Sequence, residues 1–240
     1  MRNQLTSVVT GAAGGLGHAL ATLLAERGDS LVLVDIDRDG VEAVAGRLDA
    51  AVALCVDVAD PAAMDQLARA TDRCDLLCLN AGVLSEDVGP PWESSPDEWE
   101  RVLGVNLGGV VNGLRSFVPR LLEQPTPSHV LITASLAGLA TWPGGGPYGA
   151  SKHAVVAVAE QAALALQASP VAVSVLCPGL VQTAMSPEGE DPAVVAAGAL
   201  AALDTGRFAI VPEAWAPAVR ERSVLLTSGQ APKIPTVDTD

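Results

Sequence analysis

Tyr148 and Lys152 are the residues of this sequence whose types and spacing most directly suggest chemistry. Tyr148 is the only tyrosine among 240 residues, Lys152 is one of two lysines, and they stand four positions apart in the stretch YGASK. On a helix this spacing places two side chains on the same face, about one turn apart. An ammonium beside a phenol favours the phenolate, which brings a group with a free pKa of about 10 closer to a working pH. The pair therefore predicts an acid–base group that exchanges a proton with a substrate.

A glycine-rich stretch near the start of the chain predicts a dinucleotide site. TGAAGGLG, residues 10–17, lies between the apolar run SVVT and the helix-like segment HALATLLAER. Glycines at a strand-to-helix turn let the backbone approach a pyrophosphate, whose charge is met by unpaired N–H groups of the helix. Such turns also occur as purely structural tight turns. Asp35 ends the next apolar run 18 residues beyond Gly17, close to the roughly 20 residues expected for an acid that binds an adenosine ribose, and this favours dinucleotide binding.

Asp35 also indicates which dinucleotide binds. A carboxylate accepts a hydrogen bond from a ribose 2′-hydroxyl but repels a 2′-phosphate, and Ile36 after it offers no positive charge against that repulsion. We therefore expect NAD rather than NADP. Arg38 is the residue that weakens this expectation.

The segments around these motifs predict an α/β fold. Short β-branched runs alternate with longer segments rich in Ala, Leu and Glu, a pattern typical of βαβ units around a parallel sheet. We expect helices to begin at Asp60 and at Ser95, each followed by proline, and another helix from about Gly149 to Leu166. The expected strands are almost continuously apolar, which indicates helices on both faces of the sheet; they are SVVT, LVLVD, AVALCV, DLLCLN, HVLIT, VAVSVLC and FAIV.

Composition and charge exclude several classes of protein. With 28 acidic residues against 14 Lys and Arg, the net charge of −14 argues against nucleic-acid binding, which requires clustered cations. No apolar run reaches the roughly 18 residues of a membrane helix, and MRNQLTSVVT is too polar for a signal sequence. We expect a cytoplasmic protein with no membrane partner. Without repeats or linker-like segments, residues 1–240 are expected to form a single domain, with 213–240 as a C-terminal extension that carries a short helix near 214–226.

The cysteines and histidines show no pattern typical of a metal site. The four cysteines lie in apolar runs and are expected to be reduced, buried thiols, and no metal is expected. The three histidines share no motif, and His153 is expected to face solvent beside Lys152.

Six motifs in order relate the chain to a known family: TGAAGGLG, NAG at 80–82, Asn106, Ser135, YGASK and PGLVQT at 178–183. With these motifs the sequence resembles the single-domain short-chain dehydrogenase/reductase family from about Leu5 to Thr183. The resemblance implies a Rossmann-like three-layer αβα sandwich with a seven-stranded parallel sheet of order 3-2-1-4-5-6-7. It also implies hydride transfer between NAD(H) and a secondary alcohol or ketone. Homotetramers are common in the family, so a homo-oligomer, either tetramer or dimer, is expected.

The resemblance further implies a catalytic set of Asn106, Ser135, Tyr148 and Lys152. Ser135 follows the strand HVLIT at its carboxyl end, where ligands of open sheets bind, and its hydroxyl can donate to a carbonyl oxygen as charge develops. Asn106 would hold a water that passes protons from Lys152 to solvent. The cofactor contacts, taken with the glycine loop and the acid, are Gly11, Gly14, Gly15, Leu16, Gly17, Asp35, Ile36, Asp57, Val58, Asn80, Ala81, Gly82, Tyr148, Lys152, Pro178, Gly179, Val181 and Thr183. For Asn80 a role in tying strand edges together is an equal alternative, and Asp57 can simply belong to a turn.

The substrate is less closely defined by the sequence. Four positions would line the pocket if the resemblance holds, and most are apolar, which favours an apolar secondary alcohol or ketone; they are Leu84, Leu136, Trp142 and Met185. Leu79, Ala134 and Pro147 depart from the usual pattern of the family without removing a reacting group, and residues 184–191 are short for a substrate lid. An NAD-binding sensor or scaffold without turnover is the alternative function. An epimerase, a dehydratase or an enoyl reductase fits the motifs less well.

Overall fold

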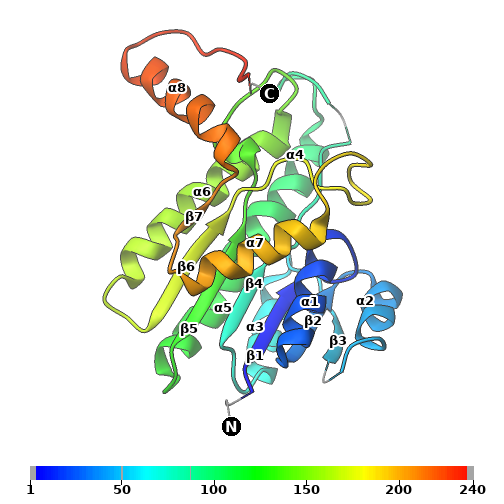
Figure 1. The fold of residues 1–240 in the computed structure, drawn as a ribbon. Helices are drawn as coiled ribbons and strands as arrows, with labels where there is room; N and C mark the ends of the chain where they lie inside the picture. Colours follow the sequence, from blue (N-terminus) through cyan, green and yellow to red (C-terminus); the bar gives the residue numbers. More distant parts are fainter. Residues whose placement is uncertain (1–3, 50, 87, 237–240) are drawn as a thin grey trace.

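A central parallel sheet of seven strands organises the molecule (Figure 1). The computed structural model describes residues 4–49, 51–86 and 88–236, so the ends of the expected domain, 1–3 and 237–240, lie outside it. Neighbouring strands follow the order β3-β2-β1-β4-β5-β6-β7 and all pairs are parallel. The strands are β1 (Thr6–Thr10), β2 (Ser30–Asp35), β3 (Ala51–Cys55), β4 (Leu76–Leu79), β5 (Ser128–Thr133), β6 (Val171–Leu176) and β7 (Ala209–Ile210). This topology confirms the fold class expected from the sequence.

Helices connect the strands and cover both faces of the sheet. The α-helices are α1 (Gly15–Arg27), α2 (Arg38–Ala45), α3 (Pro61–Ala70), α4 (Pro96–Leu103), α5 (Gly109–Glu123), α6 (Gly146–Leu166), α7 (Pro192–Asp204) and α8 (Ala216–Thr227). The shorter helical segments are η1, a π-helical stretch between α4 and α5 (Gly104–Gly108), and the 3-10 turns η2 (Leu136–Gly138) and η3 (Glu213–Trp215).

Two apolar cores hold the three layers together. On one face α1, α2 and α7 pack against the sheet through side chains such as Leu20, Val41 and Ala199, and Figure 1 shows α1 and α7 in front of the strands. On the other face α3, α5 and α6 contribute Met64, Phe117 and Val155, which are fully or almost fully buried. Because both faces are covered, nearly every position of the central strands is apolar. These cores fix the carboxyl ends of β4, β5 and β6, where the expected catalytic residues lie.

The caps expected for two helices are present. The side chain of Asp60 accepts a hydrogen bond from the N–H of Ala62 at 2.8 Å and begins α3. Ser95 accepts from the N–H of Glu98 at 3.1 Å and begins α4. Each cap satisfies one of the N–H groups left unpaired at a helix start. In both helices a proline takes the first position, where the missing N–H costs nothing.

Three local expectations require correction. Helix α6 begins at Gly146, three residues before Gly149, because Pro147 fits the first helical turn instead of preventing it. Cys55 is exposed, whereas the other cysteines are buried, because it ends β3 at the uncovered edge of the sheet. His153 does not simply face solvent, since its Nε2 atom is buried. Among the described residues no helix is both long and apolar enough to cross a membrane.

Candidate active site

Helix α6 brings Tyr148 and Lys152 together. The Nζ atom of Lys152 lies 5.8 Å from the centroid of the Tyr148 ring. Lys152 is only 4 % exposed, and its Nζ donates a hydrogen bond to the carbonyl oxygen of Thr133, the last residue of β5, at 3.1 Å. The ammonium is therefore held at the carboxyl end of the sheet, beside the phenol, as the spacing in YGASK predicts.

Burial determines the pKa values of this pair. Loss of hydration lowers the pKa of Lys152 to about 8, an effect that the nearby thiol of Cys177 opposes. Burial raises the pKa of Tyr148, and the hydroxyl of Ser135 acts in the opposite direction by hydrogen bonding. The sequence predicts that Lys152 lowers the pKa of Tyr148. In the protein without cofactor or substrate the pKa is raised instead, because desolvation of the phenolate outweighs the polar contacts.

Ser135 stands between the ends of β5 and β6. It is buried, and its Oγ accepts a hydrogen bond from the N–H of Ala137 at 3.1 Å, which begins the η2 turn. The N–H of Leu136 donates to the carbonyl oxygen of Pro178 at 2.9 Å. These contacts fix the Ser135 hydroxyl near Tyr148 at the edge of the sheet where open α/β folds bind ligands.

Asn106 lies in the π-helical segment η1 and is 1 % exposed. Its Oδ1 accepts from the N–H of Val83 at 2.8 Å, while its Nδ2 donates to the carbonyl oxygen of Val83 and to Ser151 Oγ, each at 3.0 Å. A Cβ atom on Gly82 would lie 3.2 Å from Asn106 Oδ1 and 3.4 Å from Lys152 Nζ. Asn106 and Lys152 therefore converge on Gly82. The π-helical segment that carries Asn106 is of a kind often found at functional sites. Its role in holding a water stays a prediction.

The glycine loop between β1 and α1 has the shape of an anion site. Gly15 adopts a φ of +52°, and a Cβ atom on Gly17 would lie 1.9 Å from the carbonyl oxygen of Gly11, so both positions require glycine. Gly14 begins α1 without a side-chain cap, and the space where its Cβ would stand is open. The first N–H groups of α1 thus have no side-chain partner in the loop and fit a pyrophosphate.

Asp35 ends β2 beside this loop. Its Oδ2 accepts from the N–H of Ala13 at 2.9 Å and its Oδ1 from the N–H of Asp37 at 3.1 Å. Carboxylate oxygens have further lone pairs, so the group can still accept from a ribose hydroxyl. Arg38 forms an ion pair with Glu42 at 3.6 Å on α2, and Ile36 is exposed next to the acid.

Asn80 joins the ends of three strands. Its Nδ2 donates to the carbonyl oxygen of Thr10 on β1 at 3.1 Å, and its Oδ1 accepts from Thr133 Oγ1 on β5 at 3.1 Å. The N–H groups of Asn80 and Ala81 both donate to Thr10 Oγ1. The structure therefore shows the structural role of Asn80, and its cofactor contact stays a prediction.

The other expected cofactor contacts occupy turns at the same edge of the sheet. Asp57 Oδ1 accepts from the N–H of Ala59 at 2.8 Å, which places this acid in a turn before α3. A Cβ atom on Gly15 would lie 2.9 Å from Thr183 Cγ2, so the segment after β6 returns to the glycine loop. Of the remaining expected contacts, Leu16 lies in the first turn of α1, and the others lie on the segments after β3 and β6: Val58, Pro178, Gly179 and Val181.

Comparison with known proteins decides the family. The family profile described as short chain dehydrogenase matches residues 6–192. The chain belongs to the short-chain dehydrogenase family. It is 43 % identical over 190 residues to 1-deoxy-11-beta-hydroxypentalenate dehydrogenase of Streptomyces avermitilis, covering 75 % of this chain and 70 % of the relative. It is 36 % identical over 185 residues to meso-2,3-butanediol dehydrogenase of Serratia marcescens, covering 75 % and 72 %.

A solved structure extends the likeness beyond the matched segment. A short-chain dehydrogenase/reductase of Burkholderia phymatum in complex with NAD superposes with a TM-score of 0.91 at 31 % identity, covering 97 % of this chain and 98 % of that one. This short-chain dehydrogenase is thus an oxidoreductase that transfers hydride between a nicotinamide cofactor and an alcohol or ketone.

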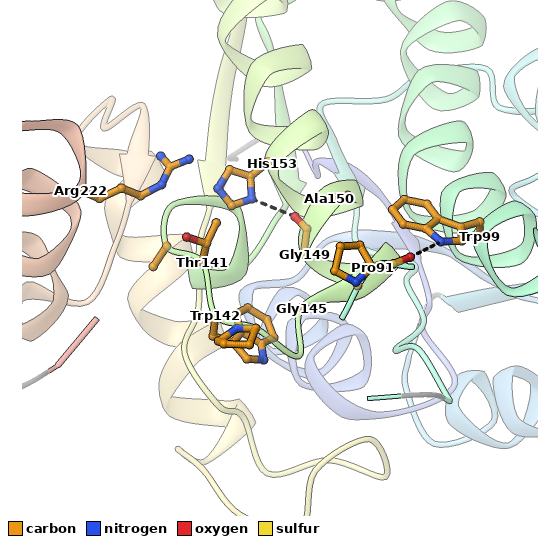
Figure 2. Close-up of a pocket in the computed structure, with 12 residues that line it drawn as sticks. Pro91, Trp99, Thr141, Trp142, Gly145, Gly149, Ala150, His153 and Arg222 are labelled. Carbon is orange, nitrogen blue, oxygen red and sulfur yellow. Dashed lines mark hydrogen bonds between the residues drawn. The ribbon is translucent and has the colours of Figure 1, made fainter. Parts of the chain in front are cut away.

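The structure places the four expected substrate residues of this short-chain dehydrogenase in different surroundings. A cavity of about 340 Å³ is lined by Trp142 but not by the other three (Figure 2). Leu136 is buried, whereas Leu84 and Met185 are exposed around the carboxyl edge of the sheet. In the described part of the chain, no three His, Cys, Asp or Glu side chains lie close enough together to hold a metal ion.

Two contacts of the dehydrogenase site were not anticipated. Ser151 Oγ donates to the carbonyl oxygen of Tyr148 at 2.7 Å and accepts from Asn106, so it links two expected catalytic residues. Its place within YGASK, three residues after the tyrosine on one helix, is the signal that could have found it. The carbonyl oxygen of Thr133, which accepts from Lys152, carries no such signal because a backbone atom is common to every residue type.

Proposed function

We propose that this short-chain dehydrogenase acts on a secondary alcohol with an apolar body, prefers NAD, and uses Tyr148 as its acid–base group. The observation that carries the proposal is the placement of the Tyr148 ring 5.8 Å from a buried ammonium at the carboxyl edge of the sheet. The Ser135 hydroxyl stands beside the phenol, and a proton-transfer group with a neighbouring donor is what alcohol oxidation requires.

NAD fits the groups at the carboxyl ends of β1 and β2. We assign the pyrophosphate to the turn from Gly14 to Gly17 and the adenosine ribose to Asp35. Arg38 is engaged by Glu42, so the cation best placed to offset a 2′-phosphate already has a partner. The Burkholderia phymatum relative was solved in complex with NAD, which agrees with this preference. When bound, NAD supplies the carbon that accepts the hydride.

The chain's own residues move the proton. Because burial raises the pKa of Tyr148, its phenol is protonated at neutral pH and is ready to donate to a ketone oxygen. In the oxidation direction the phenol must first lose its proton, and the Lys152 ammonium favours that loss wherever the lysine remains charged. The Ser135 hydroxyl holds the substrate oxygen, while Asn106 and Lys152 form the inner end of a route for protons toward solvent.

The substrate class draws on the relatives and on the expected lining. The relatives' names denote a hydroxypentalenate and a 2,3-butanediol, both of which carry a hydroxyl group. Leu84, Leu136 and Met185 at the edge of the sheet are apolar, and they support a substrate with an apolar body rather than a small diol.

One experiment tests the reaction, the cofactor and the role of Tyr148 together. The wild-type protein and Tyr148→Phe are screened against secondary alcohols and ketones with NAD(H) and NADP(H), following absorbance of the reduced nicotinamide. We expect turnover with NAD(H) in the wild type and a loss on the order of 10² to 10⁴-fold in the variant. Fluorescence titration should give a dissociation constant for NADH within about twofold of the wild-type value, because the substitution removes only the phenol oxygen and leaves the fold undisturbed.

Three outcomes of this screen would each contradict a different part of the proposed function. Near-normal activity of Tyr148→Phe would remove the tyrosine from the reaction. A higher kcat/KM with NADP would show that Asp35 does not select the cofactor. Tight NADH binding without turnover of any alcohol or ketone in the panel would favour a sensor or scaffold.

A further inference from the structure

A cavity lies on the side of α6 next to the one that carries Tyr148 and Lys152. Its volume is about 340 Å³, which lies at the lower end of the roughly 300 to 1,000 Å³ of small-molecule sites. Helix α6 contributes Gly146, Gly149, Ala150 and His153, while residues 140–143, Gly145, Pro91, Trp99 on α4 and Arg222 on α8 complete the lining (Figure 2). None of Asn106, Ser135, Tyr148 and Lys152 lines it. The cavity is therefore separate from the four catalytic side chains, although Trp142, which the sequence placed in the substrate pocket, lines it.

Arg222 brings an uncompensated positive charge to this cavity. The partly buried guanidinium forms no ion pair and no hydrogen bond with any residue that the structure describes. Other partly buried arginines differ: Arg73 pairs with Asp75 at 2.9 Å and Arg101 with Glu98 at 2.8 Å. In a chain with 28 acidic residues and 14 Lys and Arg, an arginine left without a carboxylate is available to a ligand that carries one.

His153 supplies a second unpaired polar atom. Its Nδ1 lies 2.9 Å from the carbonyl oxygen of Gly149, and because a carbonyl only accepts, Nδ1 is the donor. Its Nε2 is buried and has no hydrogen-bond partner among the described residues. A buried polar atom without a partner is uncommon in native proteins and calls for one. In Figure 2 the Arg222 guanidinium points toward the His153 ring, so both unpaired groups serve the same end of the cavity.

The rest of the lining is apolar and aromatic. Trp99 Nε1 already donates to the carbonyl oxygen of Pro91 at 3.2 Å, so this indole offers the cavity an apolar surface and no free donor. Trp142, Pro143 and Ala140 add further apolar surface. Flat aromatic walls with one charged end favour a compact, apolar, ring-containing anion over a phosphate or a sugar.

We propose that this cavity is a second small-molecule site, which binds an apolar carboxylate of about the size of a two-ring aromatic acid. The carboxylate pairs with Arg222, while the ring system lies against Trp99 and Trp142 and turns its positive edge toward the lone pair of His153 Nε2. The assignment is independent of the reaction, because it needs neither the cofactor nor any residue of the catalytic set.

Isothermal titration calorimetry with 1-naphthoate tests the site directly, with the uncharged 1-naphthamide as the matched ligand. We expect saturable binding of 1-naphthoate to the wild type and a dissociation constant at least about tenfold higher for Arg222→Gln. The control is Arg220→Gln, which removes an exposed arginine of α8 that does not line the cavity and should leave the affinity unchanged. The amide should bind more weakly than the acid, and equally to all three proteins.

Trp142→Ala, which removes one aromatic wall of the cavity, provides a second, independent variant. It should also weaken binding of 1-naphthoate, and a thermal melt of each variant establishes that it is folded before the titration. Equal affinity of the wild type and both cavity variants, or no saturable binding to the wild type, would overturn the assignment. A loss of affinity as large in Arg220→Gln as in Arg222→Gln would also overturn it, since binding would then reflect the general charge of α8.

Discussion

At the scale of single residues, Lys152 is the most unusual side chain in the molecule. A lysine that is 4 % exposed and makes one hydrogen bond, to a backbone carbonyl, loses most of its hydration. The cost appears in its pKa, which burial lowers to about 8. Proteins retain such a group where its charge is used, and here the charge stands beside the phenol of Tyr148. The site is thus built at the expense of folding stability.

This cost predicts a pH-dependent effect of Lys152→Met. Below about pH 8 the lysine is charged in both folded and unfolded chains, so the full cost of burying the charge is present. Between about pH 8 and about pH 10 the unfolded chain binds more protons at this residue than the folded chain does, so the wild type gains stability as pH rises. The free energy of unfolding of Lys152→Met minus that of the wild type should therefore decrease over this range.

Urea denaturation at several pH values measures this difference. Lys233→Met, which changes an exposed lysine near the C-terminus, is the matched control. A difference between Lys152→Met and the wild type that stays constant from about pH 7 to about pH 10 would contradict the inferred pKa of Lys152.

At the scale of elements, the site is made by turns at the carboxyl ends of parallel strands. The β1–α1 turn supplies the anion site, β2 ends in Asp35, and the ends of β4, β5 and β6 supply Asn80, Thr133 and Cys177. Parallel strands bring these turns to one edge although they are far apart in the sequence. Helix α6 then inserts Tyr148 and Lys152 at the same edge.

The β1–α1 turn offers a matched pair of glycine substitutions. Gly17→Ala places a Cβ atom 1.9 Å from the carbonyl oxygen of Gly11 and should lower stability by about 1 to 3 kcal/mol or more. Gly14 has extended backbone geometry, with a φ of −162°, and no atom within 4 Å of its missing Cβ, so Gly14→Ala should leave the melting temperature unchanged.

The same substitution at Gly14 should nevertheless weaken NADH binding, because the new methyl group enters the space over the start of α1 that we assign to the pyrophosphate. Fluorescence titration with NADH and thermal melts of the cofactor-free protein separate the two effects. Wild-type NADH affinity in Gly14→Ala would show that the pyrophosphate lies elsewhere.

Element positions followed from the sequence wherever one residue carries a local signal. Asp60 and Ser95 begin helices because their side chains accept hydrogen bonds from N–H groups two or three residues on, a short-range interaction that a sequence displays. The π-helical form around Asn106 and the earlier start of α6 were not foreseen. The first depends on packing against a distant segment, as in the contact of Asn106 with Val83. The second depends on Pro147, which fits the first turn of α6 instead of preventing it. Packing between distant segments also forms the cavity that Trp142 lines, whereas the sequence indicated only a place for Trp142 in the substrate pocket.

At the scale of the whole molecule, an acidic surface surrounds two apolar cores. The net charge of −14 opposes close approach of two copies, yet apolar side chains remain exposed on helices that cover one face of the sheet. Leu164 on α6 is 73 % exposed and Leu122 on α5 is also exposed. We propose that residues 1–240 form a single domain with 213–240 as a C-terminal extension, and that copies associate through apolar surface of this kind.

We expect multi-angle light scattering to give a dimer or tetramer of the 24.4 kDa chain at physiological ionic strength. Association brings like charges together. Their repulsion reaches only about 8 Å, one Debye length, at 0.15 M salt, but it reaches about 30 Å at 0.01 M salt. Lowering the ionic strength should therefore raise the fraction of monomer at a fixed protein concentration.

Leu164→Glu adds a charge to exposed apolar surface and should also raise the fraction of monomer. Val52→Glu, at an exposed position of the edge strand β3, is the matched control. A single species of 24.4 kDa at every salt and protein concentration would refute association.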